Sequence, residues 1–298
     1  MTNLMIDCDN VSKNHKGFQL DTISLQLKIG QVMGLIGENG AGKSTLIRLL
    51  MGFLQPDSGC IHLLGHNMRH EHAAAKAHIG YVSEDMGLYG DADLGWHMGF
   101  SASVYPAWDH AYAELLLKRF ALTVEMKPNA MSRGERIKAS LLLAFARKPS
   151  LLILDEPMTG LDPVARQEVI SAMMDVVAEE NRSILFSSHH MEDVERLSDQ
   201  ICLMEKGRLS VNQDTTHFLD RWRRIRLRLS SQRQLSLVKG FQLMRANGSL
   251  AVGISSDFSD ETIKVLQESG GKIEAVERMT LEEIFNSRQS STEERTAA

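Results

Sequence analysis

Residues 37–44 read GENGAGKS and come directly after the apolar run VMGLI at residues 32–36. The stretch matches the pattern G-x-x-x-x-G-K-[S/T], and apolar positions recur at helical spacing after Ser44. A strand, a glycine-rich loop and a helix in this order bind phosphate, because backbone N–H groups and the helix N-terminus point at the phosphate oxygens. The stretch therefore predicts an α/β fold of the P-loop NTPase type. We expect Lys43 to reach the β- and γ-phosphates and Ser44 to offer its hydroxyl to Mg²⁺.

A second motif, LLILDEP at residues 151–157, delivers two carboxylates at the end of an apolar strand. Ligands of α/β proteins bind at the carboxyl ends of strands. We expect Asp155 to hold the Mg²⁺ shell and Glu156 to orient or deprotonate a water for phosphoryl transfer. Two acidic residues after a strand are by themselves more often a solvated turn, and only the phosphate loop favours the functional interpretation.

The rest of the first 220 residues completes an α/β domain with a helical insert. Residues 23–29 alternate as a half-buried strand, and the apolar runs at 60–64, 79–82 and 184–186 predict further strands. From about residue 85 to 147 the apolar spacing is helical. We therefore assign residues 1–220 to a nucleotide-binding domain with a helical subdomain at about 85–147.

The pattern changes beyond residue 220. Residues 221–228 alternate between arginine and other side chains, Asn247-Gly248 predicts a turn, and residues 261–268 are helical in pattern. Thr280 and Glu283 have the spacing of a capping box that opens a last helix. We predict a small α+β appendage over residues 221–286 and a disordered tail over 287–298.

Composition narrows the function classes. The chain has 298 residues, 43% hydrophobic and 24% charged, which excludes a disordered or low-complexity protein. A net charge of −5 argues against sequence-independent nucleic-acid binding, so we expect no nucleic-acid partner. The three cysteines form no CxxC pair, which argues against a disulfide framework or a thiolate zinc site. The apolar runs are shorter than the roughly 20 residues of a membrane span, and the first residues do not resemble a signal peptide, so a cytoplasmic protein is expected.

Three more motifs follow in order: MSRGE at residues 131–135, TGLDP at 159–163 and SSH at 187–189. With the phosphate loop and LLILDEP, over about residues 1–220, they resemble the nucleotide-binding domain of ATP-binding-cassette (ABC) proteins. In detail the chain is most similar to bacterial exporters whose ATPase and membrane subunits are separate chains. Members of that group contain stretches similar to YPAWD at residues 105–109. Their signature motif, which corresponds to MSRGE here, often has a basic residue in place of its first glycine.

The resemblance implies a site that binds and hydrolyses ATP with Mg²⁺. It implies that His189 contacts the γ-phosphate and the water held by Glu156, and that His15 stacks on the adenine. The implied Mg²⁺ ligands are Ser44, Asp155 and Glu84. The implied phosphate-binding residues are Gly37, Glu38, Asn39, Gly40, Ala41, Gly42, Lys43, Ser44 and Thr45.

The resemblance also implies a head-to-tail dimer, with a second copy or with another ABC ATPase subunit. In such a dimer the signature, which comprises Ser132, Arg133, Gly134 and Glu135, acts on the ATP bound to the partner, and Asp162 reports across the interface. A further implied partner is an integral-membrane permease, which would hold the chain at the cytoplasmic face of the inner (plasma) membrane. The implied function is the ATPase subunit of an exporter.

The sequence departs from the family pattern at a few positions. Glu84 stands where the family usually has Gln, and ionised Glu only accepts hydrogen bonds whereas Gln also donates. Arg133 and Glu135 replace Gly and Gln in the signature, so Arg133 either pairs with Glu135, approaches phosphate or faces solvent. His15 replaces the usual adenine-stacking aromatic residue, and nearby Phe18 is a possible substitute.

Three other classes of ABC protein fit the sequence less well than a transporter subunit does. A soluble factor in translation usually has two cassettes in one chain, whereas this chain has one phosphate loop. A DNA-repair member would insert a long coiled coil, and the sequence contains no sustained heptad run. A regulatory module without turnover is disfavoured because Glu156 is present.

Two weaker features of the sequence each allow two interpretations. The insert contains Trp96, Phe100, Tyr105 and Trp108, which are either exposed anchors for the membrane partner or core residues of the insert. The arginines of residues 221–228 either meet anionic lipid headgroups or form the polar face of a strand, and the second interpretation is favoured.

Overall fold

The computed structural model describes residues 3–15, 17–83, 86–178, 181–229 and 240–296, the last eight of these as backbone only. The chain forms two compact units, Met1–Asn212 and Gln213–Ala298. Glu84, which the sequence analysis assigned to coupling and metal binding, lies outside the described residues.

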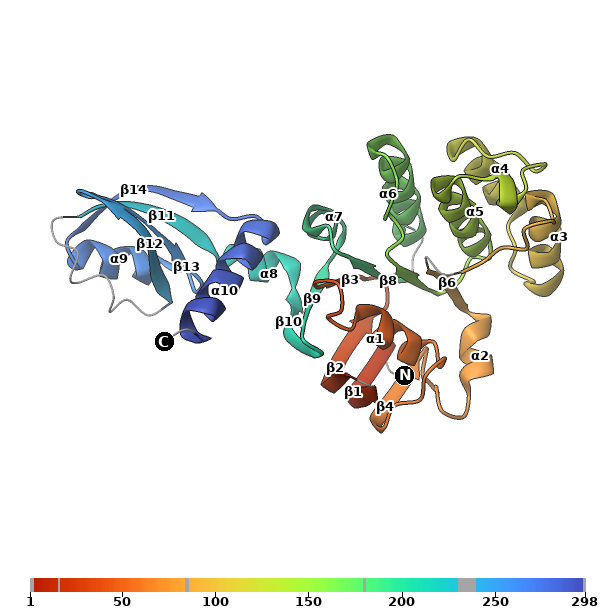
Figure 1. Cartoon of the computed structure of the whole chain (residues 1–298), viewed down its shortest axis with the longest axis horizontal. Helices are drawn as coiled ribbons and strands as arrows, with labels where there is room; N and C mark the ends of the chain where they lie inside the picture. Colours follow the sequence, from red (N-terminus) through yellow and green to blue (C-terminus); the bar gives the residue numbers. More distant parts are fainter. Residues whose placement is uncertain (1–2, 16, 84–85, 179–180, 230–239, 297–298) are drawn as a thin grey trace. The chain divides into compact units, whose positions relative to one another are not determined.

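The first unit is built around a largely parallel sheet (Figure 1). Its interior strands are buried along their whole length, as expected for strands covered on both faces. Strand β3 (Val32–Ile36) pairs in parallel with β9 (Gln200–Glu205) and β8 (Ser183–Ser188). Strand β7 (Leu151–Asp155) pairs in parallel with β8 and β6 (Ile79–Ser83). The strand order is β10 (Arg208–Asp214), β9, β3, β8, β7 and β6.

A second, antiparallel sheet is formed by strands from the N-terminal part of this unit. It contains β2 (Phe18–Lys28), β1 (Leu4–His15), β4 (Ser58–Leu63) and β5 (His66–Asn67), in that order. Helix α1 (Lys43–Leu50) supplies Leu46 and Ile47, both fully buried, to a core shared with residues of both sheets such as Leu25 and Leu35. The phosphate loop is therefore anchored by the core on its helical side.

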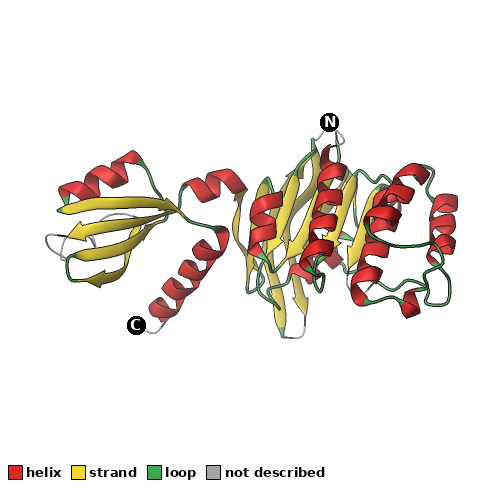
Figure 2. Ribbon diagram, turned by 90° about the horizontal axis from the view of Figure 1, so that it is seen from above, coloured by secondary structure: helices red, strands yellow, loops and turns green. Residues whose placement is uncertain are grey.

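The helical insert gathers next to β6 (Figures 1 and 2). Helix α5 (Arg133–Ala146) packs against α3 (Leu94–Val104), α4 (His110–Arg119), α6 (Pro163–Ala178) and β6. Asp93 and Asp109 cap α3 and α4 by accepting hydrogen bonds from the backbone of Trp96 and Tyr112. Further helices of the unit are α2 (His72–Ala77), η1 (Pro128–Ala130) and α7 (Met191–Leu197).

The second unit is an antiparallel sheet with a helix packed on one face. Leu266 of α9 (Asp260–Glu268) lies in a core with Ile225 and Leu227 of β11 (Arg223–Leu229). The turn at Asn247-Gly248 joins β12 to β13, and Gly248 has a φ of 60°. The elements are α8 (Thr215–Asp220), β11, β12 (Phe241–Asn247), β13 (Leu250–Ser255), α9, β14 (Gly271–Arg278) and α10 (Leu281–Thr296), with the sheet order β12-β13-β11-β14.

The second unit begins and ends differently from the sequence prediction. It starts at Gln213 and includes α8, in which the Leu219 carbonyl and the Asp220 carboxylate accept hydrogen bonds from the Arg223 guanidinium. The Thr280 capping box forms as predicted. Helix α10 then continues to Thr296, across residues predicted as a disordered tail. Residues 281–296 contain neither Gly nor Pro, so nothing in the sequence ends the helix earlier.

The arginines of β11 make ion pairs inside their own unit. Arg224 pairs with Glu283 at 3.0 Å, Arg226 with Glu277 at 2.9 Å and Arg228 with Glu274 at 2.8 Å. The residues between them, such as Ile225, are buried on the opposite face. This pairing fits the polar-face interpretation of the arginine-rich stretch.

Candidate functional site

The loop between β3 and α1 has a backbone that requires glycine. Gly40 and Gly42 have φ values of 82° and 110°. A Cβ on Gly42 would lie 2.6 Å from Phe18 Cζ, so a side chain there would clash as well. The loop is closed by a hydrogen bond from the Ala41 N–H to the Glu38 carbonyl at 3.1 Å.

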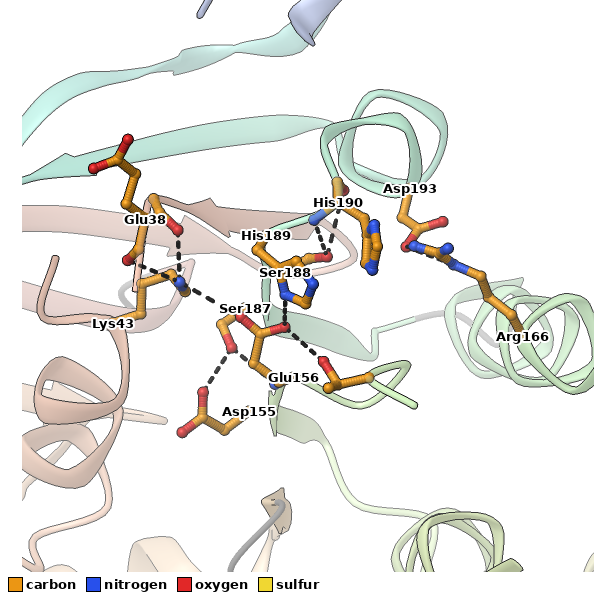
Figure 3. Close-up of polar contacts among 12 residues, drawn as sticks. Glu38, Lys43, Asp155, Glu156, Arg166, Ser187, Ser188, His189, His190 and Asp193 are labelled. Atoms are coloured by element: carbon orange, nitrogen blue, oxygen red, sulfur yellow. Dashed lines mark hydrogen bonds and ion pairs between the residues drawn. The ribbon is translucent and has the colours of Figure 1, made fainter. Parts of the chain in front are cut away.

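Lys43 is buried at the first position of α1. Its Nζ donates to the Gly37 carbonyl at 2.6 Å and to the Glu38 carbonyl at 3.3 Å. It also lies 3.4 Å from Glu156 Oε1 (Figure 3). The loop thus holds one ammonium group facing one carboxylate.

A cavity of about 530 Å³ opens beside Lys43, within the usual size range of ligand pockets. Its lining combines a glycine loop, an ammonium group, hydroxyls and a carboxylate, a donor set that fits a polyphosphate with a hard cation. The lining residues are His15, Phe18, Glu38, Asn39, Gly40, Gly42, Lys43, Ser44, Thr45 and Glu156.

The two carboxylates at the end of β7 are held differently. Asp155 is buried and accepts a hydrogen bond from Ser187 Oγ at 2.6 Å. Glu156 follows in a left-handed backbone conformation, with a φ of 52°. Its Oε2 lies 2.8 Å from His189 Nδ1 and accepts a hydrogen bond from Thr159 Oγ1 at 3.0 Å. Glu156 is therefore fixed at both its backbone and its carboxylate.

The electrostatics keep Glu156 ionised. Burial raises the pKa of this carboxyl, but the hydrogen bond from His189, the charge of Lys43 and the hydrogen bond from Thr159 outweigh it, and the net pKa lies below the ordinary value. Because the pKa is lower in the folded chain, ionised Glu156 stabilises the fold at neutral pH. This contribution to the free energy of unfolding is lost as the pH falls through the folded-state pKa. At neutral pH the group is a carboxylate able to accept a proton.

His189 lies between the carboxylate and helix α7. The rings of His189 and His190 are 4.1 Å apart. Burial, Arg166 and His189 lower the pKa of His190. In α7, buried Asp193 accepts two hydrogen bonds from Arg166 of α6, and one of them, from Nε, measures 3.0 Å (Figure 3). This pair ties the helix that follows His189 to the helix that follows Glu156.

The signature residues cap helix α5. Ser132 Oγ accepts a hydrogen bond from the Glu135 N–H at 3.2 Å, and Glu135 Oε2 accepts one from the Ser132 N–H at 2.7 Å. Glu135 is thus part of a capping box, which the spacing S-x-x-E in the sequence would have revealed. Arg133 lies against Gly160, where an added Cβ would be 3.3 Å from the arginine Nε.

Asp162 caps helix α6 and is exposed. Its Oδ1 accepts hydrogen bonds from Val164 N–H at 2.9 Å and Ala165 N–H at 3.0 Å, which lower its pKa despite opposing desolvation. Neither Asp162 nor the signature residues 132–135, all within the described part of the chain, line the Lys43 cavity.

The structure thus brings together the phosphate loop, Asp155, Glu156 and His189, and leaves the signature and Asp162 outside the cavity. Thr159 and Ser187, which hold the acidic pair, are not among the site residues predicted from the sequence. The hydroxyls in TGLDP and in SSH were the signals that could have identified them.

Comparison with known proteins agrees with this geometry. The model of the family described as "ABC transporter" matches residues 20–159. The ABC transporter ATP-binding protein YtrB of Bacillus subtilis is 31% identical, over 94% of this chain and 97% of its own. The Nod factor export ATP-binding protein I of Paraburkholderia xenovorans is 32% identical over 70% of each chain. The thiamine import ATP-binding protein ThiQ of Rhizobium meliloti is 33% identical over 64% of this chain and 82% of its own.

A solved structure, described as the ATP-binding subunit of an ABC transporter, superposes with a TM-score of 0.67 at 27% identity, covering 72% of this chain and 92% of its own. Among the described residues no helix is both long and apolar enough to cross a bilayer. The chain therefore belongs to the ABC transporter family, as an ATP-binding subunit that hydrolyses ATP with Mg²⁺.

Proposed function

We propose that Glu156 is the general base of ATP hydrolysis at the Lys43 cavity and that this reaction drives export through the membrane partner. The observation that carries the proposal is the set of contacts at the Glu156 carboxylate, which meets Lys43 at 3.4 Å, His189 at 2.8 Å and Thr159 at 3.0 Å. An ionised carboxylate beside a phosphate counter-charge is suited to orient and deprotonate the attacking water.

The other polar groups in and around the cavity have roles in binding. Lys43 supplies the positive charge for the β- and γ-phosphates, and Ser44 and Asp155 supply oxygen ligands for Mg²⁺, with Glu84 as a further ligand. When bound, Mg²⁺ neutralises charge on the phosphate oxygens. His15 and half-buried Phe18 both line the cavity and offer ring faces to the adenine. The backbone N–H groups that receive the phosphates belong to residues 37–45.

The dimer completes the site with the signature of a second subunit. Ser132 and Arg133 are exposed at the N-terminus of α5, where the helix dipole is positive, yet they do not line their own chain's cavity. This supports a role of Ser132 and Gly134 as donors to the γ-phosphate bound by the partner, with Glu135 holding Ser132 and Asp162 reaching across the interface. The second subunit is a copy of this chain or another ABC ATPase.

An exposed aromatic cluster supports a docking surface for the membrane partner, which would hold the chain at the cytoplasmic face of the membrane. The α3 patch consists of Tyr89, Trp96 and Phe100, which are 75%, 48% and 56% exposed. Trp96 and Phe100 are stacked with centroids 5.5 Å apart, and Tyr89 meets Trp96 edge-on at 5.9 Å. Exposed apolar clusters of this kind mark protein interaction sites.

The α3 patch excludes two residues that the sequence analysis grouped with it. Trp108 is buried, at 9% exposure, and so belongs to the core of the insert. Tyr105 lies under the Arg147 guanidinium, 3.4 Å from its carbon. Only Trp96 and Phe100 of the four aromatic residues remain as candidate anchors.

Export is favoured over import by sequence features. The basic residue in the signature and the YPAWD stretch resemble separately encoded exporters. The match to a Nod factor export protein supports this direction, and the match to a thiamine import protein represents the alternative.

The direction of transport is tested in proteoliposomes that contain this chain and the membrane protein encoded beside it. The ATPase subunit and ATP are on the outer side of the vesicles, and cell-extract solutes are on both sides. Mass spectrometry of the lumen would find a solute enriched by ATP if the complex exports, and depleted if it imports.

We predict that Trp96→Ala lowers the membrane-bound fraction of the chain several-fold when it is co-expressed with that membrane protein. ATP binding by the isolated chain should not change, because Trp96 lies outside the cavity lining. The control is Phe53→Ala, which removes another aromatic side chain, 55% exposed, away from the patch. Trp108→Ala should instead lower the free energy of unfolding by about 3–5 kcal/mol. Equal recruitment of Trp96→Ala and Phe53→Ala would refute the docking role.

We predict that Glu84→Ala lowers turnover in the assembled complex more than it lowers nucleotide affinity, while Glu84→Gln stays active. Glu84 follows Ser83, the residue of β6 that is paired with Asp155 in the sheet. An oxygen ligand for the metal is retained in Gln and lost in Ala. Steady-state ATPase and nucleotide-binding assays check this, and equal activity of parent, Ala and Gln forms would make Glu84 a bystander.

A further inference from the structure

Ser187 links the two acidic residues of the site. It lies near the end of β8 and is fully buried. Its Oγ donates to Asp155 Oδ1 at 2.6 Å and accepts from the Glu156 N–H at 2.8 Å (Figure 3). One hydroxyl therefore contacts the side chain of one carboxylate residue and the backbone of the next.

The backbone at Glu156 needs such a partner. Leu154 is the last residue of β7 paired with β8, opposite Phe186, and Glu156 then turns into the left-handed region with a φ of 52°. A non-glycine residue rarely adopts this conformation unless its surroundings fix it. A partly buried N–H that has left the sheet ladder also requires another acceptor. Ser187 Oγ supplies that acceptor.

We propose that Ser187 is a positioning residue that sets the distance between the Mg²⁺ ligand Asp155 and the base Glu156. The inference rests on the roles proposed above for these two carboxylates. The hydroxyl fixes one Asp155 oxygen, so the other stays free for the cation. It also fixes the turn that aims the Glu156 side chain at Lys43 and His189. Loss of the hydroxyl would let both carboxylates shift without removing either.

The chain provides a matched control in the adjacent serine. Ser188 is also buried, but its Oγ bonds to His190, accepting from its N–H at 3.0 Å and donating to its carbonyl at 3.3 Å. It makes no hydrogen bond to Asp155 or Glu156 among the contacts of the described residues. Ser188→Ala thus removes a buried hydroxyl from the same strand without touching the acidic pair.

The test compares Ser187→Ala, Ser187→Cys and Ser187→Thr with Ser188→Ala in the full-length chain. Removing a group that orients a metal ligand typically lowers activity or metal affinity about 10- to 100-fold. We expect kcat to fall by this factor in Ser187→Ala and Ser187→Cys, with ATP affinity within about twofold of the parent, as measured with a fluorescent ATP analogue. The Mg²⁺ concentration for half-maximal activity should rise. Ser187→Thr, which keeps the hydroxyl, should retain most of the kcat of the parent, and Ser188→Ala should match the parent.

Cysteine keeps the side-chain volume but bonds weakly, so Ser187→Cys tests the hydrogen bonds even if Ser187→Ala does not fold. A Ser187→Cys variant with parental kcat and Mg²⁺ dependence overturns the proposal. So does an equal loss of activity in Ser187→Ala and Ser188→Ala. Glu156→Gln, measured in parallel, distinguishes failure of the proposed base, Glu156, from failure of the proposed positioning role of Ser187. If it is fully active the proposed base is wrong, whereas an inactive Glu156→Gln beside a fully active Ser187→Cys rejects only the positioning role.

Discussion

We expect Glu156→Gln to lower the steady-state ATPase rate by about 10²- to 10⁴-fold, the range that general acid–base catalysis contributes. The amide has nearly the same shape as the carboxylate, and it can still meet Thr159 and His189, which contact Glu156 Oε2 in the parent. It cannot accept a proton from water, so the chemical step is lost. ATP binding should persist, because Lys43 and the glycine loop are unchanged.

The measurable consequence is an ATP-bound dimer that does not turn over. Light scattering with MgATP should detect a lasting dimer of Glu156→Gln and only a transient one of the parent. Glu192→Gln, which neutralises an exposed carboxylate of α7, is the control and should behave as the parent does. If Glu156→Gln releases phosphate at the parental rate, Glu156 is not the base.

The central parts of the site were predictable because each is encoded within a short stretch of sequence. Lys43 and Glu156 both follow buried strands, and parallel neighbours end at the same edge of a sheet. Any chain with strands 32–36 and 151–155 in one parallel sheet brings the two residues to that edge. The P-loop pattern also specified Gly42, whose φ of 110° lies in the left-handed region.

The groups that position these residues were not predictable in the same way. Ser187 contacts Asp155 and Glu156 only because β8 lies between β3 and β7 and pairs with β7 in one register. Strand order and register depend on contacts far apart in the sequence, and the spacing of motifs does not contain them. Thr159 reaches Glu156 because of the turn after β7, which the sequence does not reveal either.

Which aromatic side chains of the helical insert are buried was also not predictable from the sequence. Trp96 and Trp108 lie in similar surroundings in the sequence, yet one is 48% and the other 9% exposed. Trp96 is on α3, whereas Trp108 precedes α4 and is buried. Which aromatic residue faces solvent depends on how the short helices pack, because composition alone favours burial of both.

Lys43→Ala should remove ATP binding and, with it, hydrolysis. Hydrogen bonds to charged groups contribute about 1.5–3 kcal/mol, which corresponds to a fall in ATP affinity of about 10- to 100-fold. ATP affinity should fall further because of Glu156. Its carboxylate would then face the phosphates without the Lys43 ammonium that lies 3.4 Å away in the parent. The carbonyls of Gly37 and Glu38 would also lose the donor that holds the loop in shape. Turnover at ordinary ATP concentrations should fall to the background rate.

Lys43→Arg is the informative companion variant. Lys43 is only 6% exposed, and the larger planar guanidinium cannot occupy the position of the ammonium between the two carbonyls without moving the loop. We therefore expect Arg to restore charge but not affinity. Lys118→Ala, which removes an exposed lysine from α4, should leave binding unchanged. Calorimetric titration with ATP distinguishes the roles of Lys43 and Glu156, because Lys43→Ala should lose ATP binding while Glu156→Gln keeps it. Tight ATP binding by Lys43→Ala would show that backbone groups alone hold the phosphates, and that Lys43 serves only to fix Glu156.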